Sequence, residues 1–242
     1  MVVVYSATRN LYPYLRDAIA SLLEYNSPRR IIILAEDDTI PEVPFAGVEV
    51  INVSNQEYFP TDSANYNGAF TYMSMMRLLY TELLPDESKV LQLDVDTVVC
   101  DSLLPIWDID LTGKWFAAVP EYRGTYKPFG DYLPYFNVGV MVLNLDQIRA
   151  DHIIPVMIAE LNRKRYWCTE QDVWNLYAVD AGKAAMLDVR FNETKFTGTT
   201  DKPAVVHFAG IKNWYDLPAG MERKEYLLRA RATALVDPPG QK

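Results

Sequence analysis

Short apolar runs alternate with amphipathic segments along most of this 242-residue chain. The runs are four to eight residues long and rich in β-branched side chains, which is typical of buried strands. They lie at residues 2–5, 31–34, 48–53 and 90–93, with further ones at 115–119 and 138–145. Strands that alternate with helices favour a mainly parallel sheet with helices packed on it. The pattern therefore predicts an α/β fold.

Helical periodicity is found between these runs, at residues 14–25, 69–84, 146–163 and 170–179. The third of these segments is expected to break near Pro155, because proline removes a helix hydrogen bond. The polar stretch 54–68 is interpreted as a long functional loop rather than a linker. No shift in composition marks a domain boundary, so one domain is expected.

Composition narrows the classes of function. The net charge of −9 argues against a surface built to bind nucleic acid. No run of about 18 apolar residues is present, so no membrane span is expected. The opening residues 1–5 are too short and too uncharged for a signal peptide and are interpreted as a first strand. Cys100 and Cys168 have neither metal-binding nor redox spacing, which is typical of free thiols in a reducing cytoplasm.

Two carboxylates, Asp94 and Asp96, interrupt the apolar stretch Leu91–Val99. Anions in a segment suited to burial are costly unless they are neutralised. Their i, i+2 spacing puts both side chains on one face of an extended backbone. Carboxylate oxygens suit a hard divalent cation, which usually also takes phosphates and waters as ligands. On spacing alone, a solvated turn at a strand end is the alternative.

Polar residues also follow the first strand. In open α/β sheets, ligands bind outside the carboxyl ends of the strands. The loop at residues 6–10 offers the side chains of Ser6, Thr8 and Asn10 but has no glycine-rich phosphate fingerprint. These groups are better suited to reading the edge of a base, and a helix cap by Thr8 or Asn10 is the alternative.

Two further motifs carry polar side chains at predicted strand ends. Asn137 and Gly139 stand where strand 138–145 begins, and a glycine there would let a ligand approach the backbone. Taken alone, Asn137 is more typical of a hydrogen bond at a strand entry. His207 follows another apolar run and precedes Gly210 and Lys212. Histidine can complete a metal site and lysine suits a phosphate, whereas a structural histidine is the alternative.

Taken together, these motifs resemble family 8 of the retaining glycosyltransferases, the group of glycogenin and the bacterial lipopolysaccharide galactosyl- and glucosyltransferases. The resemblance covers roughly residues 1–215 and rests on several motifs in order. They are residues 4–10, 76–78, 93–96, 101–103, 107–111, 136–140 with 144–145, 170–172 with Asn175, and the segment around His207. The resemblance implies a GT-A type, single Rossmann-like domain at residues 1–220, with a mainly parallel central sheet flanked by helices. A C-terminal helix and tail would occupy residues 221–242.

The resemblance also implies a set of site residues. Asp94, Asp96 and His207 would bind Mn²⁺ or Mg²⁺, and the metal would hold the diphosphate of a UDP-sugar. Gly210 and Lys212 would contact the phosphates. Ser6, Thr8, Asn10 and Val95 would hold uridine, and Arg77, Asn137, Glu170 and Gln171 would surround the sugar. Val138 and Gly139 would be further nucleotide- or sugar-binding positions. The catalytic group would consist of Gln171, which faces the anomeric carbon, with its neighbours Glu170 and Asp172.

This chain departs from the family pattern at several points. Glu170 stands where the family usually has aspartate, and its extra methylene moves a carboxylate that would hold sugar hydroxyls. The segment between Gly210 and Lys212 is one residue shorter than usual, which bears on the phosphate contact of the lysine. Glu121 occupies a position at which a related acidic residue can contact the sugar.

The implied function is metal-dependent, retaining transfer of a hexose from UDP-glucose or UDP-galactose to a hydroxyl, with an α-linkage. The acceptor would be a glycan, a lipid-linked molecule or a protein, in the cytoplasm or at the cytoplasmic membrane surface. A sugar-nucleotide nucleotidyltransferase is one alternative, but it requires a glycine-rich basic loop after the first strand. A non-catalytic sugar-nucleotide binder is the other.

Two segments of this sequence allow more than one interpretation. The aromatic side chains of residues 122–136 form either an acceptor platform or the local packing of a long loop. Residues 222–231 are expected to form a surface helix, with at most peripheral membrane contact, because glutamates are interleaved with the basic residues.

Overall fold

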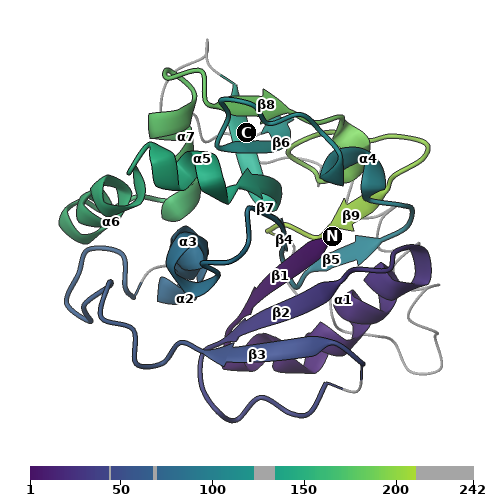
Figure 1. The fold of residues 1–242 in the computed structure, drawn as a ribbon, viewed down its shortest axis with the longest axis horizontal. Coiled ribbons are helices and arrows are strands. Elements are labelled where there is room, and N and C mark those ends of the chain that lie inside the picture. The colour runs from purple at the N-terminus through teal and green to yellow at the C-terminus, as the bar shows by residue number, and fades with distance from the viewer. Residues whose placement is uncertain (44, 68–69, 123–133, 211–242) are drawn as a thin grey trace, which may run out of the picture.

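The computed structural model describes residues 1–43, 45–67, 70–122 and 134–210. A seven-stranded sheet in this part of the chain has the strand order β3-β2-β1-β4-β7-β6-β8 (Figure 1). Its strands are β1 (Val2–Ala7), β2 (Arg30–Ala35), β3 (Val48–Asn52), β4 (Lys89–Leu93), β6 (Phe116–Glu121), β7 (Tyr135–Asn144) and β8 (Ala184–Met186). Each strand predicted in the sequence is present, and the α/β class is confirmed.

One strand, β7, runs against both of its neighbours. The pairs β1–β2, β2–β3, β1–β4 and β6–β8 are parallel, whereas β4–β7 and β6–β7 are antiparallel. The sheet is therefore mainly parallel, as expected. Antiparallel pairing places the start of β7 beside the end of β4, and the amide of Asp94 donates to the carbonyl oxygen of Gly139 at 2.8 Å. The reversed strand thus brings two predicted motifs together.

A second, two-stranded sheet consists of β5 (Thr97–Val99) and β9 (Val205–His207). The strands are antiparallel, and Thr97 pairs with His207. The amide of Phe208 also donates to the carbonyl oxygen of Asp96 at 2.9 Å. The apolar stretch 91–99 therefore belongs to two sheets, and its aspartates lie at the junction between them.

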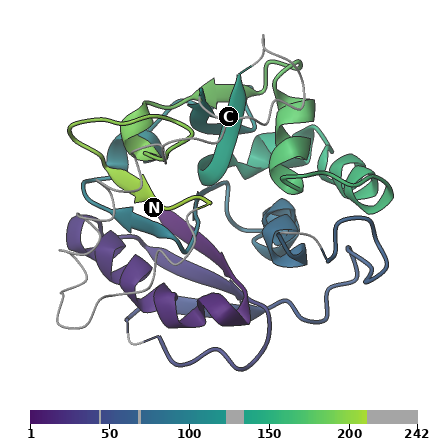
Figure 2. The same ribbon diagram turned by 180° about the vertical axis from the view of Figure 1, so that it is seen from behind.

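Helices pack on both faces of the large sheet (Figures 1 and 2). On one face, α1 (Tyr12–Tyr25), α4 (Leu104–Trp107) and the 3₁₀-helix η3 (Val189–Phe191) contribute to the core that contains Val3 and Tyr5. On the other, α2 (Tyr72–Met75), η2 (Met76–Leu79), α3 (Tyr80–Leu83), α5 (Leu145–Ala150), α6 (Ile154–Arg163) and α7 (Glu170–Ala178) contribute to the core that contains Val2 and Val4. Successive residues of β1 point to opposite faces, so each face receives alternate side chains.

The predicted helix boundaries need two adjustments. The helix expected at 69–84 starts at Tyr72, where the Thr71 side chain accepts a hydrogen bond from the Met73 amide, and its middle turn is a 3₁₀-helix. The segment 146–163 divides into α5 and α6, and Pro155 lies in the first turn of α6. Proline is tolerated there because the first helical amides have no intrahelical partner. Residues 54–66 contain neither helix nor strand, as predicted for a loop.

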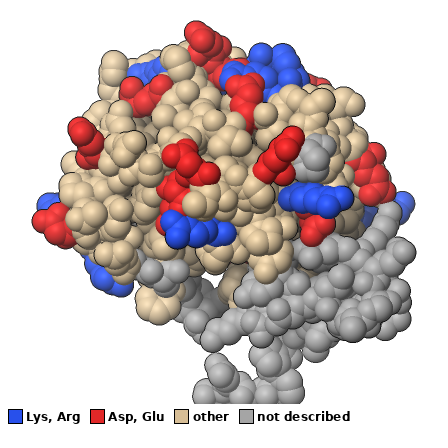
Figure 3. All heavy atoms as spheres, turned by 90° about the horizontal axis from the view of Figure 1, so that it is seen from below, with Lys and Arg blue, Asp and Glu red and all other residues tan. Residues whose placement is uncertain are grey.

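The described surface carries charges of both signs. On the face drawn in Figure 3, acidic and basic side chains lie beside one another rather than in a basic patch. Within the described residues, no helix combines the length and the apolar character needed to span a bilayer. Both cysteines are free thiols. Lys212 and the predicted C-terminal helix lie outside the described residues.

Candidate active site

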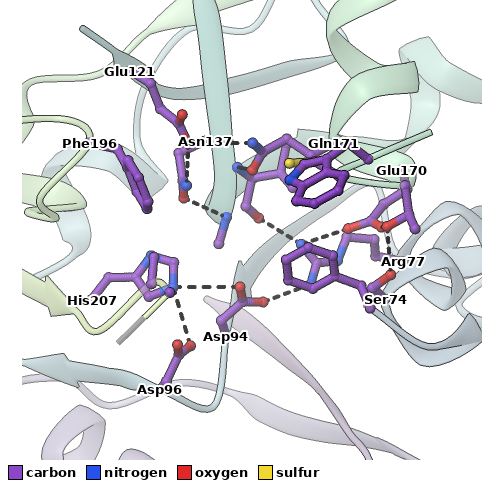
Figure 4. Close-up of a pocket in the computed structure, with 18 residues that line it drawn as sticks. Ser74, Arg77, Asp94, Asp96, Glu121, Asn137, Glu170, Gln171, Phe196 and His207 are labelled. Atoms are coloured by element: carbon purple, nitrogen blue, oxygen red, sulfur yellow. Dashed lines mark hydrogen bonds and ion pairs between the residues drawn. The ribbon is translucent and has the colours of Figure 1, made fainter. Parts of the chain in front are cut away.

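Two neighbouring cavities lie where β4 ends and β7 begins. The first has a volume of about 400 Å³ and is lined by Asp94, Asp96 and His207 together with residues of β7 and α7 (Figure 4). The second has a volume of about 370 Å³ and is lined by the loop after β1. The two share Phe70, Ser74, Arg77, Asp94 and Asp96 among their lining residues. They therefore form adjoining parts of one site, with the aspartates between them.

The side chains of Asp94, Asp96 and His207 converge in the first cavity. Nε2 of His207 lies 3.2 Å from Oδ1 of Asp96 and 3.7 Å from Oδ2 of Asp94. One ligand atom from each residue lies within 4.8 Å of the other two. Adjacent ligands of an octahedral ion at 2.0–2.1 Å are about 3 Å apart, so this spacing and this donor set fit a divalent cation.

Neighbouring charges shift the pKa values of His207 and Asp96. Burial lowers the pKa of His207, but the attraction and hydrogen bond of Asp96 together with the attraction of Asp94 outweigh it, so the net pKa is above the ordinary value. Burial raises the pKa of Asp96, but the attraction and hydrogen bond of His207, with a backbone hydrogen bond and the charge of Arg77, together outweigh burial, so its net pKa is lowered. The site thus stabilises a positive charge beside the two carboxylates, whether that charge is a proton or a metal ion.

Arg77 holds Asp94 in place from the opposite side. Its Nη2 donates to Oδ1 of Asp94 at 2.7 Å, and its Nη1 donates to the Val138 carbonyl oxygen at 3.0 Å. Nη1 also lies 3.2 Å from Oε1 of Glu170. Gln92 donates a second hydrogen bond to Oδ1 of Asp94 at 3.0 Å. Since Oδ1 has two protein donors, Oδ2 is the oxygen turned toward His207.

Arg77→Lys is expected to lower kcat/KM for the sugar transfer that the resemblance implies by about tenfold, because one ammonium cannot reproduce a planar fork with three acceptors. Steady-state rates of UDP release from the implied UDP-sugar donor measure this change. Arg149→Lys is the matched control, since Arg149 donates to the backbone carbonyls of Thr81, Leu84 and Glu87 outside the cavity. The control should lose thermal stability and keep its turnover. Equal rates in Arg77→Lys and the parent would contradict this role.

The position of the His207 ring requires a glycine at residue 139. A β-carbon at this position would lie 2.1 Å from Cε1 of His207 and 2.8 Å from Oδ2 of Asp94. Gly139 therefore leaves room for the imidazole ring of His207. It also lines the first cavity, so its predicted contact with a ligand stays a prediction.

Gly139→Ala is expected to weaken Mn²⁺ binding by at least about tenfold, because the added methyl group displaces the imidazole. Titration calorimetry with Mn²⁺ measures the affinity. Gly182→Ala serves as the comparison: its β-carbon meets no atom within 4 Å, but its φ of 64° strains an alanine. That variant should lose stability only. Unchanged Mn²⁺ affinity in Gly139→Ala would show that the ring is not held against this glycine.

Gln171 lies in the first turn of α7 and is fixed by three hydrogen bonds. Its Oε1 accepts from the Val138 amide at 3.1 Å. Its Nε2 donates to the Tyr135 hydroxyl at 3.1 Å and to Oε1 of Glu121 at 3.4 Å. Burial raises the pKa of Glu121, and the hydrogen bonds from Asn137 and Gln171 oppose that rise. The amide of Gln171 thus lines the cavity in a defined orientation.

The two acidic neighbours of Gln171 have different surroundings. Glu170 lines the cavity, pairs with Arg77 and accepts a hydrogen bond from the Thr169 hydroxyl at 2.5 Å. Thr169 has a φ of 43°, a strained conformation for a β-branched residue, directly before α7. Asp172 is fully buried outside the cavity lining and accepts from the Tyr135 hydroxyl and the Cys168 amide. It holds two residues of the site in position.

The second cavity receives the residues predicted for uridine. Ser6, Thr8, Asn10 and Val95 all line it. Thr8 donates to the Asn10 side-chain oxygen at 2.5 Å, and neither residue caps the adjoining 3₁₀-helix η1 (Arg9–Leu11) through its side chain. The helix-cap alternative is therefore wrong for both residues. Gly210 lines the first cavity, where the sequence places phosphate contacts.

Several residues of the site were not singled out from the sequence. Phe70, Ser74, Trp167, Thr169 and Phe196 line the first cavity, and Asn192 contacts His207 from behind. None of them stands at a recognisable spacing from the aspartates, so only the fold could reveal them. Of the aromatic segment 122–136, Tyr122 is exposed, whereas Tyr135 and Phe136 are buried and belong to local packing. Tyr126, Phe129 and Tyr132 lie outside the described residues.

The family model for glycosyl transferase family 8 matches residues 2–217. The chain belongs to this family. The match contains the whole of the described site and the motifs on which the resemblance rests.

Individual relatives agree with this membership. A Haemophilus influenzae protein described as a glycosyltransferase is 26% identical to this chain over 215 residues. The match covers 80% of this chain and 63% of that protein. An Arabidopsis thaliana protein with a galacturonosyltransferase name is 44% identical over 183 residues, or 70% of this chain and 32% of that protein. The chain thus spans less than two thirds of the length of each of these curated relatives.

The fold is shared with the crystal structure of galactosyltransferase LgtC in complex with donor and acceptor sugar analogs. The TM-score is 0.71, with 24% identity over 99% of this chain and 98% of LgtC. This likeness confirms the GT-A type fold.

Proposed function

We propose that this member of family 8 is a metal-dependent, retaining glycosyltransferase that moves a hexose from a UDP-sugar to a hydroxyl acceptor. The observation that carries the proposal is the convergence of Asp94, Asp96 and His207 with Gln171 in one cavity that adjoins a second pocket lined by hydroxyl, amide and charged side chains. In this proposal the nucleoside binds in the second pocket and the diphosphate binds beside Asp94 and Asp96, which line both cavities. The sugar binds in the first cavity, next to Gln171.

Mn²⁺ or Mg²⁺ held by Asp94, Asp96 and His207 would neutralise the charge that develops on the leaving diphosphate. The protein contributes the orientation of these ligands. Arg77 and Gln92 fix one oxygen of Asp94, and Gly139 supports the imidazole. Gly210 and Lys212 are proposed phosphate contacts, and Ser6, Thr8, Asn10 and Val95 are proposed uridine contacts.

Retention of configuration is proposed to occur by front-face substitution. The bond from the anomeric carbon to the phosphate oxygen breaks, the acceptor oxygen bonds to that carbon on the same face, and the acceptor proton passes to the phosphate. Gln171 would stabilise the positive centre with its amide oxygen. Because that oxygen already accepts a hydrogen bond from Val138, it is a poor nucleophile, which supports charge stabilisation over covalent catalysis.

The charges of the sugar pocket favour a neutral donor sugar. Among the described lining residues are four carboxylates, those of Asp94, Asp96, Glu121 and Glu170, while Arg77 is already paired with two of them. A uronic acid would add a further anion without a described cation to meet it. UDP-glucose and UDP-galactose are therefore the proposed donors. The exposed rings of Phe70 and Trp167 at the same cavity favour an acceptor that contains a sugar.

UDP release from a panel of UDP-sugars, with Mn²⁺ and with EDTA, tests the proposal. We expect slow hydrolysis of UDP-glucose or UDP-galactose with Mn²⁺, little with UDP-galacturonate, and none in EDTA. Pyrophosphate formation from UTP and a sugar phosphate would instead identify a nucleotidyltransferase. Tight UDP-sugar binding without any product, across acceptors, would identify a non-catalytic binder.

The product of transfer should be α-linked, because the donor is α-linked and configuration is retained. Proton NMR of the anomeric signal of a purified product distinguishes the two outcomes. A β-linked product would refute the retaining mechanism. We further propose that the acceptor is a glycan, a lipid-linked molecule or a protein, and that transfer takes place in the cytoplasm or at the cytoplasmic membrane surface.

A further inference from the structure

We propose that Asn192 is a positioning residue that fixes the proton of His207 on Nδ1 and thereby presents Nε2 as a metal ligand. Asn192 is fully buried and lies just after η3, on the side of the histidine remote from the aspartates. Its side-chain oxygen lies 2.8 Å from Nδ1 of His207. The inference rests on the metal site of the proposed function and assigns a residue that supports it.

The direction of each hydrogen bond follows from a backbone amide. The Gly139 amide can only donate, and it donates to Oδ1 of Asn137 at 3.1 Å. Oδ1 of Asn137 is therefore an oxygen that accepts, and the group of Asn192 that contacts it at 2.8 Å must be the amide nitrogen. The other end of Asn192, facing His207, is then its oxygen. An oxygen without a proton can only accept, so Nδ1 of His207 must carry the hydrogen.

The outcome is a defined lone pair on Nε2. That nitrogen faces Asp96 at 3.2 Å and Asp94 at 3.7 Å, the position that a metal ligand requires. Histidine ligands usually donate their second ring N–H to a protein oxygen, which sets both the tautomer and the ring orientation. Asn192 supplies that oxygen, and Gly139 leaves room for the ring in this orientation.

The same side chain links the metal ligands to the sugar pocket. Asn137, which accepts from Asn192, donates through its own amide nitrogen to Oε1 of Glu121 at 2.7 Å. Glu121 in turn accepts from Gln171. Asn192 therefore has two separable functions: its oxygen positions His207, and its nitrogen positions Asn137.

Two substitutions separate these functions. Asn192→Ala removes both groups and should weaken Mn²⁺ binding to the full chain by about 10- to 100-fold in titration calorimetry. Asn192→Asp keeps an oxygen acceptor for Nδ1–H and should stay within about threefold of the parent, because a carboxylate is also a usual partner of a ligating histidine. It loses the donor to Asn137, so its KM for the UDP-sugar should rise by about tenfold.

Matched variants separate this role from general stability. Asn65 is also buried, and its amide bonds the carbonyl oxygens of Leu161 and Lys164 away from the site. Asn65→Ala should lower the melting temperature in EDTA and leave the Mn²⁺ affinity of the folded protein unchanged. His207→Ala should bind Mn²⁺ more weakly than any Asn192 variant.

Each failure has its own signature. Parent-like Mn²⁺ affinity in Asn192→Ala, or an equal loss in Asn192→Asp, would overturn the positioning role while leaving the metal site intact. Equal Mn²⁺ binding by the parent and His207→Ala would overturn the metal site itself.

A measurement on the unmodified protein covers the case in which the alanine variant does not fold. The imidazole ¹⁵N chemical shifts of the Mg²⁺ complex report which ring nitrogen is protonated, and the chain has only two histidines. Protonation of Nδ1 in His207 supports the proposal, and protonation of Nε2 overturns it.

Discussion

Asp94→Asn and Asp96→Asn are each expected to reduce kcat/KM for sugar transfer by at least about 1000-fold, or about 4 kcal/mol of transition-state stabilisation. The asparagine amide has the size of the carboxylate but not its charge. The variants therefore lose an anionic metal ligand, and their packing is unchanged. The Arg77 guanidinium keeps Glu170 as a partner in Asp94→Asn. The Mn²⁺ affinity measured by titration and the initial rate of UDP release should decrease together.

The control for these variants is Asp146→Asn, which removes a carboxylate from an exposed pair with Arg149 on α5. Surface pairs of this kind contribute little to stability, so both rate and melting temperature should stay close to the parent values. Substantial turnover in both Asp94→Asn and Asp96→Asn, or full activity in excess EDTA, would contradict a metal-dependent reaction.

Gln171→Ala is expected to lose about 2–4 kcal/mol of transition-state stabilisation, which corresponds to about a 30- to 1000-fold decrease in kcat. The loss follows from removing an oriented amide dipole beside the centre where positive charge develops. If Gln171 were an obligatory nucleophile, almost no transfer would remain. Single-turnover rates with a saturating donor distinguish the two, because they exclude changes in binding.

Two further variants sharpen that comparison. Gln147→Ala removes an exposed amide on α5 that donates to Asp151, and its rate should equal that of the parent. Tyr135→Phe removes the hydroxyl that accepts from Gln171 but leaves the amide itself, so a smaller decrease is expected. Because the Tyr135 hydroxyl also donates to Asp172, an equal loss in Tyr135→Phe and Gln171→Ala would show that the amide acts only in the orientation that Tyr135 fixes.

The main elements of the fold could be predicted because each has a local cause. The apolar runs that become β1, β2 and β4 are too short for helices, and Pro155 marks the division between α5 and α6. The break within 69–84 had no such signal. The residues of η2 are compatible with a regular helix, and their 3₁₀ geometry became apparent only in the packed structure.

The sequence alone determined the main candidate residues for the chemistry, since the spacing of Asp94 and Asp96 and the order of the motifs are properties of the chain. Only the tertiary structure decided how they meet. The reversed direction of β7 places Gly139 against Asp94, and the pairing of β5 with β9 brings His207 to the aspartates across more than 100 residues. Strand pairing over such separations depends on the global arrangement of the sheet, which no local pattern encodes. The contacts of Asn192 depend most on the tertiary structure, because its partners Asn137 and His207 come from strands of two different sheets.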